Sequence, residues 1–142
     1  MRPLLISHRG DTSSASENTM EAFTSAFAKG AQGIEFDVQL NDQGEIIIVH
    51  HYLYDKFSHY PRLEDVLQQF GQKGLLEIEL KGLEIELVEK VAALIGKYQP
   101  KQYSLTSNIL PLLPVVRQYF PKADIGAIIK PYFIEDWIKN TK

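Results

Sequence analysis

Two apolar segments of the chain carry polar or charged side chains at alternate positions, and this spacing can build a metal site. These side chains are Glu35, Asp37 and Gln39 in residues 33–40, and Glu77, Glu79 and Lys81 in residues 75–81. Alternation places the acids of an extended strand on one face of its sheet. Carboxylates within ~6 Å repel one another, and a hard divalent cation relieves this repulsion by binding their oxygens. An antiparallel sheet with one solvated face gives the same alternation without a metal, so both interpretations stay open.

Histidine and arginine side chains follow two other apolar segments. His8 and Arg9 come directly after residues 3–7, and His50 closes residues 45–50. Ligands of α/β proteins bind outside the carboxyl ends of parallel strands, so polar residues there are candidates for ligand contacts. Histidine suits proton transfer because its ordinary pKa of about 6.5 lies near neutral pH. An isolated histidine more often satisfies the local structure, and Arg9 is also compatible with a surface charge or an ion pair.

Short apolar segments alternate with helical patterns along the chain. The predicted strands cover residues 3–7, 33–40, 45–50, 75–80, 102–106 and 124–129. Apolar residues recur at helical spacing within 20–27, 63–70, 87–95 and 112–120, and a last helix is predicted over 131–139. Asn18 and Glu21 are predicted to cap the first helix. Residues 41–44 are too few for a helical crossover, so the flanking strands form a hairpin or lie together after a tight turn. This order predicts an α/β domain with a mainly parallel sheet.

Composition and charge exclude several classes of protein and of binding partner. The chain has 142 residues, which fits one domain, and its formal net charge of -3 predicts no nucleic-acid partner and no acidic membrane surface. It has no cysteine, which excludes disulfides and thiolate chemistry and agrees with a reducing compartment. No window approaches the roughly 18 apolar residues of a membrane span, and no signal peptide is recognised. We therefore expect a cytoplasmic protein.

The order of the motifs resembles that of the glycerophosphodiester phosphodiesterase family. The motifs are "HRG" (8–10), "ENTMEAF" (17–23), "GIEFDVQLNDQGEIIIVHH" (33–51), "RLEDVL" (62–67) and "EIELK" (77–81). A weaker likeness continues through "SLTSN" (104–108) and "FPKADIGAI" (120–128). The resemblance implies a TIM-barrel-like fold. It also implies hydrolysis of a glycerophosphodiester, a small-molecule substrate, to sn-glycerol 3-phosphate and an alcohol.

The resemblance also implies roles for individual residues. His8 and His50 match the two catalytic histidines, which act as general acid and base. Arg9 and Lys81 match side chains that bind the substrate phosphate. The residues that match the ligands of a divalent metal, Ca or Mg, are Glu35, Asp37 and Glu79. These roles agree with the chemistry, because attack on an anionic phosphodiester needs charge neutralisation and two proton transfers.

The chain departs from the family pattern near the second histidine. His51 stands where the family usually has aspartate, and Ser16 stands where proline precedes "ENT". The family's long insertion is missing, because residues 52–61 lead almost directly into the next helix. The aromatic residues of this segment are candidates for a shortened pocket rim or for packing. Two alternatives therefore remain: a catalytically weakened relative that binds a metal or phosphorylated ligand, and a phosphodiesterase for another headgroup, such as a lysophospholipid.

The chain is also short for a closed barrel. A (β/α)8 barrel typically needs ~250 residues. We therefore predict a single domain over residues 1–142, a TIM-barrel-like α/β fold truncated to about six strands and lacking the last two. Such a sheet has open edges. Terminal segments could cover them, a homodimer could bury them, or the chain could be a piece of a longer protein; the apolar residues of 127–138 favour the homodimer.

Overall fold

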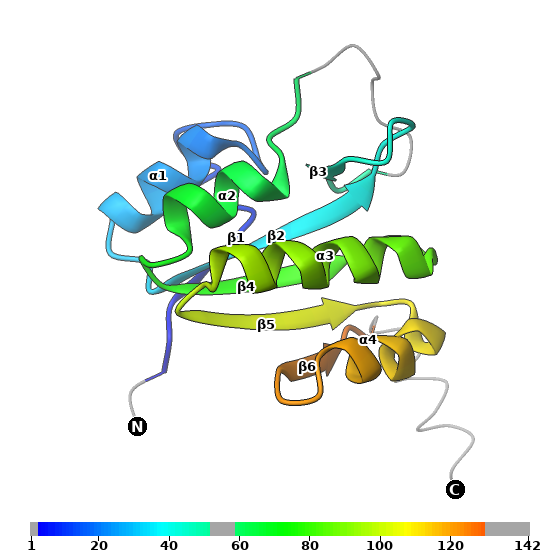
Figure 1. Cartoon of the computed structure of the whole chain (residues 1–142). Helices are drawn as coiled ribbons and strands as arrows, with labels where there is room; N and C mark the ends of the chain where they lie inside the picture. The colour runs from blue at the N-terminus through cyan, green and yellow to red at the C-terminus, as the bar shows by residue number, and fades with distance from the viewer. Residues whose placement is uncertain (1–2, 52–58, 130–142) are drawn as a thin grey trace, which may run out of the picture.

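The computed structural model describes residues 3–51 and 59–129, which form a six-stranded sheet with helices packed on it (Figure 1). The strands are β1 (Ile6–His8), β2 (Gly33–Leu40), β3 (Ile46–Ile48), β4 (Leu75–Leu80), β5 (Gln102–Ser107) and β6 (Asp124–Ala127). The order is β1-β2-β4-β5-β6 with all neighbours parallel, and β3 pairs antiparallel with β2. The predicted α/β fold with a mainly parallel sheet is confirmed.

The connection between β2 and β3 is a hairpin, which was one of the two predicted arrangements. The Asn41 side-chain oxygen accepts hydrogen bonds from two backbone N–H groups of the turn, at 3.0 and 2.8 Å. Gly44 supplies a backbone φ of 73°, a value that glycine adopts without strain. The backbone N–H of Val49 then donates to the backbone oxygen of Asp37 at 3.0 Å. The hairpin therefore returns His50 toward the middle of β2.

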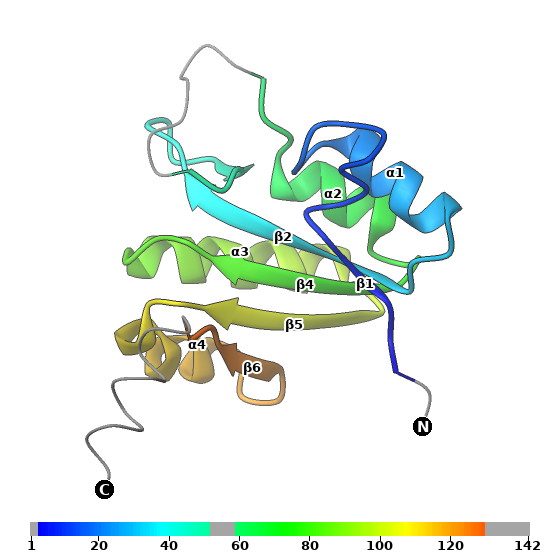
Figure 2. The ribbon, with the colours of Figure 1, turned by 180° about the vertical axis from the view of Figure 1, so that it is seen from behind.

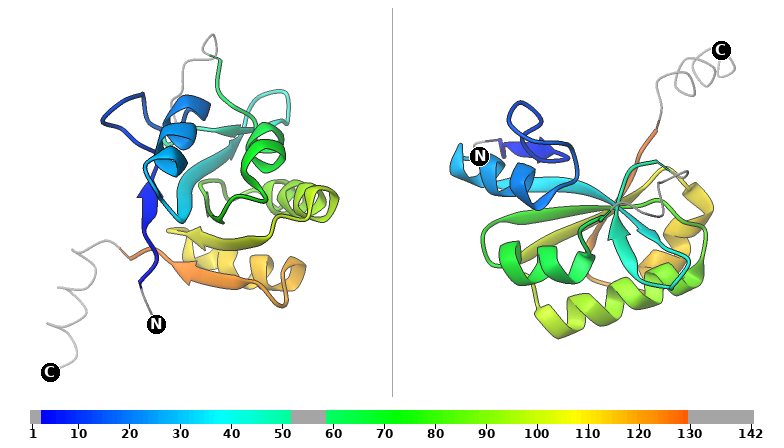
Figure 3. Two further views of the ribbon diagram at one scale, coloured as in Figure 1. Left: turned by 90° about the vertical axis from the view of Figure 1, so that its left-hand side faces the viewer. Right: turned by 90° about the horizontal axis from the view of Figure 1, so that it is seen from above.

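Helices cover one face of the sheet and form the core with it. They are α1 (Met20–Ala28), α2 (Leu63–Phe70), α3 (Ile85–Tyr98) and α4 (Leu113–Tyr119), with a short 3-10 helix, η1 (Leu110–Leu112). Seen from above, α2, α3 and α4 lie along one side of the sheet (Figure 3). The rings of Phe23, Phe36 and Phe70 meet at this interface, with centroid separations of 5.7 and 6.0 Å. Burial of such apolar side chains is the main stabilising contribution to the fold.

The predicted cap of the first helix was wrong by one residue. Thr19, not Asn18, caps α1, and its hydroxyl accepts a hydrogen bond from the Ala22 N–H at 3.2 Å. Asn18 has a φ of 57°, a left-handed conformation that asparagine tolerates better than most residues. Its side-chain amide donates a hydrogen bond to Asp37, in the site described below.

The sheet is not closed into a barrel, as the truncated-barrel prediction requires. In the described part of the chain, β1 and β6 each pair with a single neighbour. The aromatic segment 52–58 and the predicted helix 131–139 lie outside the described residues. Among the helices that are described, we find none with the length and apolar character needed to cross a membrane.

Candidate active site

Three carboxylates, those of Glu35, Asp37 and Glu79, lie close together. Figure 2 shows the face of the sheet that is turned away from α3. Glu35 and Asp37 project from β2 and Glu79 from β4, and the parallel register places Asp37 beside Glu79. One ligand atom from each side chain lies within 4.8 Å of the others. The three residues are only 8%, 0% and 5% exposed. Because β2 and β4 are parallel and the acids are buried, the solvated antiparallel face considered from sequence is excluded.

Two cations and one amide surround Asp37. Lys81 Nζ lies 3.1 Å from Asp37 Oδ1 and 2.5 Å from Glu79 Oε1. On the other side, Arg9 Nε lies 3.2 Å from Asp37 Oδ2, and Asn18 Nδ2 donates a 2.9 Å hydrogen bond to the same oxygen. Both oxygens of a fully buried carboxylate therefore have partners, which is the condition for keeping it ionised in the interior.

The three acids differ in their ease of ionisation. Burial, reinforced by the charges of Asp37 and Glu79, raises the pKa of Glu35 to about 8. Burial also raises the pKa of Glu79, although Lys81 opposes it. Burial would raise the pKa of Asp37 too, but the Asn18 hydrogen bond and the charges of Lys81 and Arg9 together hold it below its usual value.

This donor set fits a hard divalent cation. All three donors are carboxylates, the ligand type that Ca²⁺ and Mg²⁺ prefer. When ionised, the three acids carry one more negative charge than Lys81 and Arg9 neutralise. Glu35 holds this excess, because among the described residues no lysine or arginine side chain forms an ion pair with it, whereas Lys81 and Arg9 pair with the other two acids; His8 Nε2 lies 3.7 Å from Glu35 Oε2. Burial is the main cause of the raised pKa of Glu35, and a divalent cation at this position would offset the repulsion from Asp37 and Glu79 that adds to it.

A left-handed turn aims Arg9 at the carboxylates. Arg9 and Gly10 have φ values of 58° and 83°. A Cβ atom on Gly10 would lie 2.7 Å from Ala22 Cβ, so close packing against α1 requires glycine here. The Arg9 backbone N–H donates to the Glu35 backbone oxygen at 2.9 Å, and the guanidinium also contacts Glu17 at 3.1 Å. The "HRG" motif thus joins β1 to the acid cluster.

The two histidines reach the site from different directions. His8 ends β1, and its side chain is 71% exposed beside Glu35. His50 follows the hairpin. Burial lowers its pKa, and the positive charges of Arg9 and Lys81 add to this effect against the opposing charge of Asp37. The Gln39 amide donates to the backbone oxygens of Val49 and His51, at 2.9 and 3.2 Å, and so fixes the backbone on both sides of His50.

All seven residues predicted for the site therefore lie on one face of the sheet or at its edge. Three further residues contribute: Glu17, Asn18 and Gln39. Asn18 was interpreted as a helix cap. Its side-chain amide donates instead to the buried carboxylate of Asp37, and local spacing does not reveal this contact. Gln39 belongs to the same alternating pattern as the acids, and this pattern could have identified it as a residue of the site. Glu17 lies in the "ENT" motif but had no assigned role.

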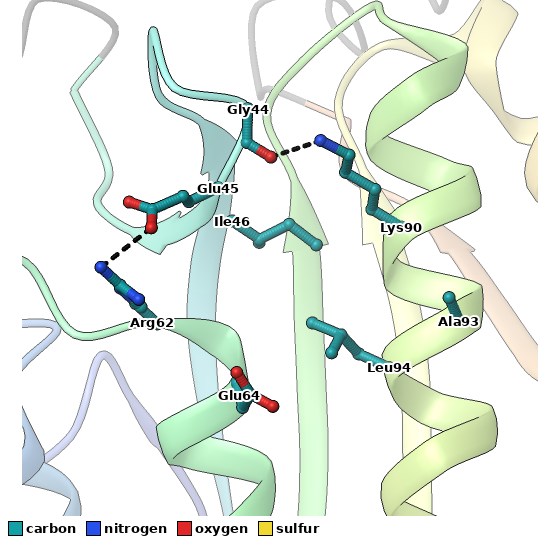
Figure 4. A pocket seen from close by; sticks show the side chains of 8 residues that line it. All are labelled: Gly44, Glu45, Ile46, Arg62, Glu64, Lys90, Ala93 and Leu94. Carbon is teal, nitrogen blue, oxygen red and sulfur yellow. Dashed lines mark hydrogen bonds and ion pairs between the residues drawn. The ribbon is translucent and has the colours of Figure 1, made fainter.

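A groove on another part of the surface does not contribute to this site. It is lined by the β2–β3 turn, α2 and α3, and Figure 4 shows its side chains. Arg62 forms a 2.8 Å ion pair with Glu45, and Lys90 forms a 2.7 Å ion pair with Glu86 and contacts the Gly44 backbone oxygen. These cations are engaged by the protein itself.

The chain is similar to several curated proteins and spans only part of the length of each. The chain is 48% identical over 50 residues to a glycerophosphodiester phosphodiesterase of Caldanaerobacter subterraneus subsp. tengcongensis, covering 35% of this chain and 21% of that protein. It is 26% identical over 162 residues to YhdW of Bacillus subtilis, covering 91% and 67%. The human protein named lysophospholipase D GDPD3 is 22% identical over 140 residues, covering 73% and 44%.

Solved structures share the fold. The glycerophosphodiester phosphodiesterase of Agrobacterium tumefaciens matches with a TM-score of 0.78 at 22% identity, covering 87% of this chain and 66% of that one. An Oleispira antarctica phosphodiesterase in complex with the product sn-glycerol-3-phosphate matches with a TM-score of 0.78 at 21% identity, covering 97% and 71%. The chain thus spans roughly two thirds of these structures. The model of the glycerophosphoryl diester phosphodiesterase family matches residues 8–132, and the chain belongs to this family.

Proposed function

We propose that this protein hydrolyses glycerophosphodiesters to sn-glycerol 3-phosphate and an alcohol, with Ca²⁺ or Mg²⁺ as cofactor. The observation that carries the proposal is the convergence of Glu35, Asp37 and Glu79, within 4.8 Å, next to two cations and two histidines. The product bound to the Oleispira antarctica relative supports the substrate class. A cation held by these carboxylates would supply the positive charge that the reacting phosphate needs.

Arg9 and Lys81 are suited to bind the phosphate. Arg9 Nε lies 3.2 Å from Oδ2 of Asp37, and Lys81 Nζ lies 3.1 Å from Oδ1 of the same carboxylate. Arginine matches phosphate oxygens with several donors, and lysine adds a compact charge. Because Asp37 holds both side chains and Glu79 also holds Lys81, little rotamer entropy is lost when substrate binds.

The histidines are suited to the two proton transfers. The lowered pKa of His50 keeps its imidazole neutral at pH 7, so His50 can accept the proton of the attacking hydroxyl group. His8, which is exposed beside Glu35, donates a proton to the oxygen of the departing alcohol. In the proposed reaction, the glycerol hydroxyl group next to the phosphate forms a bond to phosphorus as the bond to the alcohol oxygen breaks, which gives a cyclic phosphate. Water then adds to phosphorus and breaks the new ring bond, which gives sn-glycerol 3-phosphate.

The headgroup selectivity is a second part of the proposal. The human relative is named a lysophospholipase D, which favours a lysophospholipid as the alternative substrate. Purified protein is incubated with glycerophosphocholine or lysophosphatidylcholine, with Ca²⁺, Mg²⁺ or a chelator. The main proposal predicts cation-dependent release of choline together with sn-glycerol 3-phosphate. Release of choline from the lysophospholipid alone would favour the alternative. Release from neither substrate would contradict hydrolysis and favour a weakened relative that only binds ligands.

We also propose that the protein forms a homodimer in which the open edges of the sheet are covered. Within the described residues, each of the outer strands β1 and β6 has one edge without a partner. Leu4 and Leu5, next to β1, are 58% and 61% exposed, and Ile129, after β6, is 54% exposed. Apolar side chains beside open strand edges favour association.

A further inference from the structure

A second cluster of metal-binding side chains lies beside the carboxylates, at the end of the hairpin. It consists of Glu17, His50 and His51, and one ligand atom from each lies within 4.8 Å of the others. Its chemistry differs from that of the first cluster, because two of its three donors are imidazole nitrogens. Glu17 and His51 are exposed and His50 is half-buried, so the cluster is accessible from solvent.

Contacts with Arg9 and Gln39 hold the residues of this cluster in place. Arg9 holds the Glu17 carboxylate through hydrogen bonds of 3.1 and 3.3 Å. Gln39 holds the backbone oxygens of Val49 and His51. The two imidazole rings pack edge to face with centroids 4.9 Å apart. The cluster is therefore built on the same backbone anchors as the candidate active site.

His50 also has an unused nitrogen. Its Nδ1 is buried and has no hydrogen-bond partner among the described residues. A buried imidazole nitrogen without a partner is costly, and coordination of a metal is one way to satisfy it.

We propose that Glu17, His50 and His51 form an inhibitory site for zinc. Two imidazoles and one carboxylate with an open fourth position are a ligand set that Zn²⁺ accepts in tetrahedral geometry. Ca²⁺ and Mg²⁺ prefer oxygen ligands, so they are selected by the buried carboxylates and not by this cluster. The chain thus carries two adjacent sites with opposite metal preferences.

Zinc at this site occupies the imidazole of His50. The consequence for turnover rests on the proposed function, in which His50 accepts a proton. A metal-bound imidazole has no free lone pair, so zinc inhibits hydrolysis while the buried carboxylates keep their own cation. Binding itself does not depend on that function, and the two claims are tested separately.

Zinc binding is measured by isothermal titration calorimetry on the full chain in saturating Ca²⁺, without substrate. Wild type is compared with His51→Ala, which removes one ligand but keeps the backbone oxygen that Gln39 contacts. His59→Ala, at another exposed histidine, is the matched control. Titration with Co²⁺ gives a second readout, because tetrahedral coordination produces visible absorption bands.

We expect one Zn²⁺ per chain in wild type and in His59→Ala. His51→Ala is expected to lose at least tenfold in affinity, the loss typical even of an outer-shell partner, and to lose the Co²⁺ bands. Equal zinc affinity in His51→Ala and wild type, or no zinc binding by wild type, would overturn the proposal. If zinc binds as expected but the protein hydrolyses no phosphodiester, the site stands and the proposed function fails. In an active protein, inhibition by zinc is expected to be relieved in His51→Ala.

Discussion

The side-chain amide of Asn18 donates a 2.9 Å hydrogen bond to Oδ2 of Asp37, and both residues are buried. This contact joins the loop after β1 to the middle of β2. It adds to the ion pairs of Asp37 with Arg9 and Lys81. Asn18 is therefore a positioning residue that helps to keep the central carboxylate ionised.

Asn18→Ala is expected to lower the free energy of unfolding by about 1 to 3 kcal/mol. The variant loses a hydrogen bond to a buried charged oxygen and leaves that oxygen less well satisfied. Chemical denaturation at pH 7 measures the change. Gln43→Ala, which removes an exposed amide side chain, is the control and should unfold at the wild-type denaturant concentration. Equal stability of Asn18→Ala and wild type would show that this bond contributes nothing.

Without a bound cation, Glu35 is expected to make the protein less stable as pH rises. Its pKa is about 8 in the folded state, whereas the ordinary value is 4.5. Between these pH values the folded state holds a proton that the unfolded state has lost, so raising the pH favours unfolding. Glu35→Gln should flatten the decline in melting temperature between pH 5 and 8. Glu77→Gln, on the same face of the sheet at the paired position of β4, is the control. An identical decline in wild type and Glu35→Gln would contradict the role of Glu35.

Calcium or magnesium is expected to stabilise the folded protein. One bound ion at 100 times its dissociation constant contributes about 2.7 kcal/mol. Because Glu35 must lose its proton to bind the ion, the rise in melting temperature should be larger at pH 8 than at pH 6. Scanning calorimetry with and without the cation measures this rise in melting temperature. The rise should persist in Glu77→Gln and disappear in the double variant Glu35→Ala, Asp37→Ala; a rise that survives in the double variant would place the ion elsewhere.

The protein is expected to be a homodimer at micromolar concentration. The exposed Leu4 and Leu5 lie beside an edge strand and are candidates for burial in the dimer. Size-exclusion chromatography with light scattering should give twice the chain mass of 16.2 kDa. Replacing both leucines with serine should shift the equilibrium toward monomer. A wild-type protein that elutes as a monomer would count against the dimer.

The sequence was sufficient to predict the existence and order of the six strands and the acidic face, but not the limits of every strand. Alternation of Glu35 and Asp37 with Ile34 and Phe36 follows directly from the two-residue period of a strand, and β2 has the predicted limits of residues 33–40. The first strand was misplaced, because β1 covers Ile6–His8 instead of residues 3–7. Its limits depend on pairing with β2, which begins at Gly33, and local apolar content does not reveal that register.

The sequence could not predict the contacts between residues that lie far apart along the chain. Asn18 fits the pattern of a helix cap, but its side chain is engaged by a carboxylate 19 positions away. Likewise, Lys81 was expected near the phosphate, and only the structure shows that Asp37 and Glu79 hold it. The meeting of Glu17 with His50 depends on the return of the β2–β3 hairpin, which joins segments remote in sequence.

The most direct test of the central claim is hydrolysis of glycerophosphocholine in Ca²⁺ by wild type, His8→Ala, His50→Ala and the control His59→Ala. Release of sn-glycerol 3-phosphate is followed with a coupled enzyme assay. General acid–base catalysis contributes typically 10²–10⁴-fold, so each active-site variant should lose at least about 100-fold in kcat. His59→Ala should keep the wild-type rate. Turnover by His8→Ala and His50→Ala at the wild-type rate, or no turnover by wild type, would contradict the proposed catalytic site.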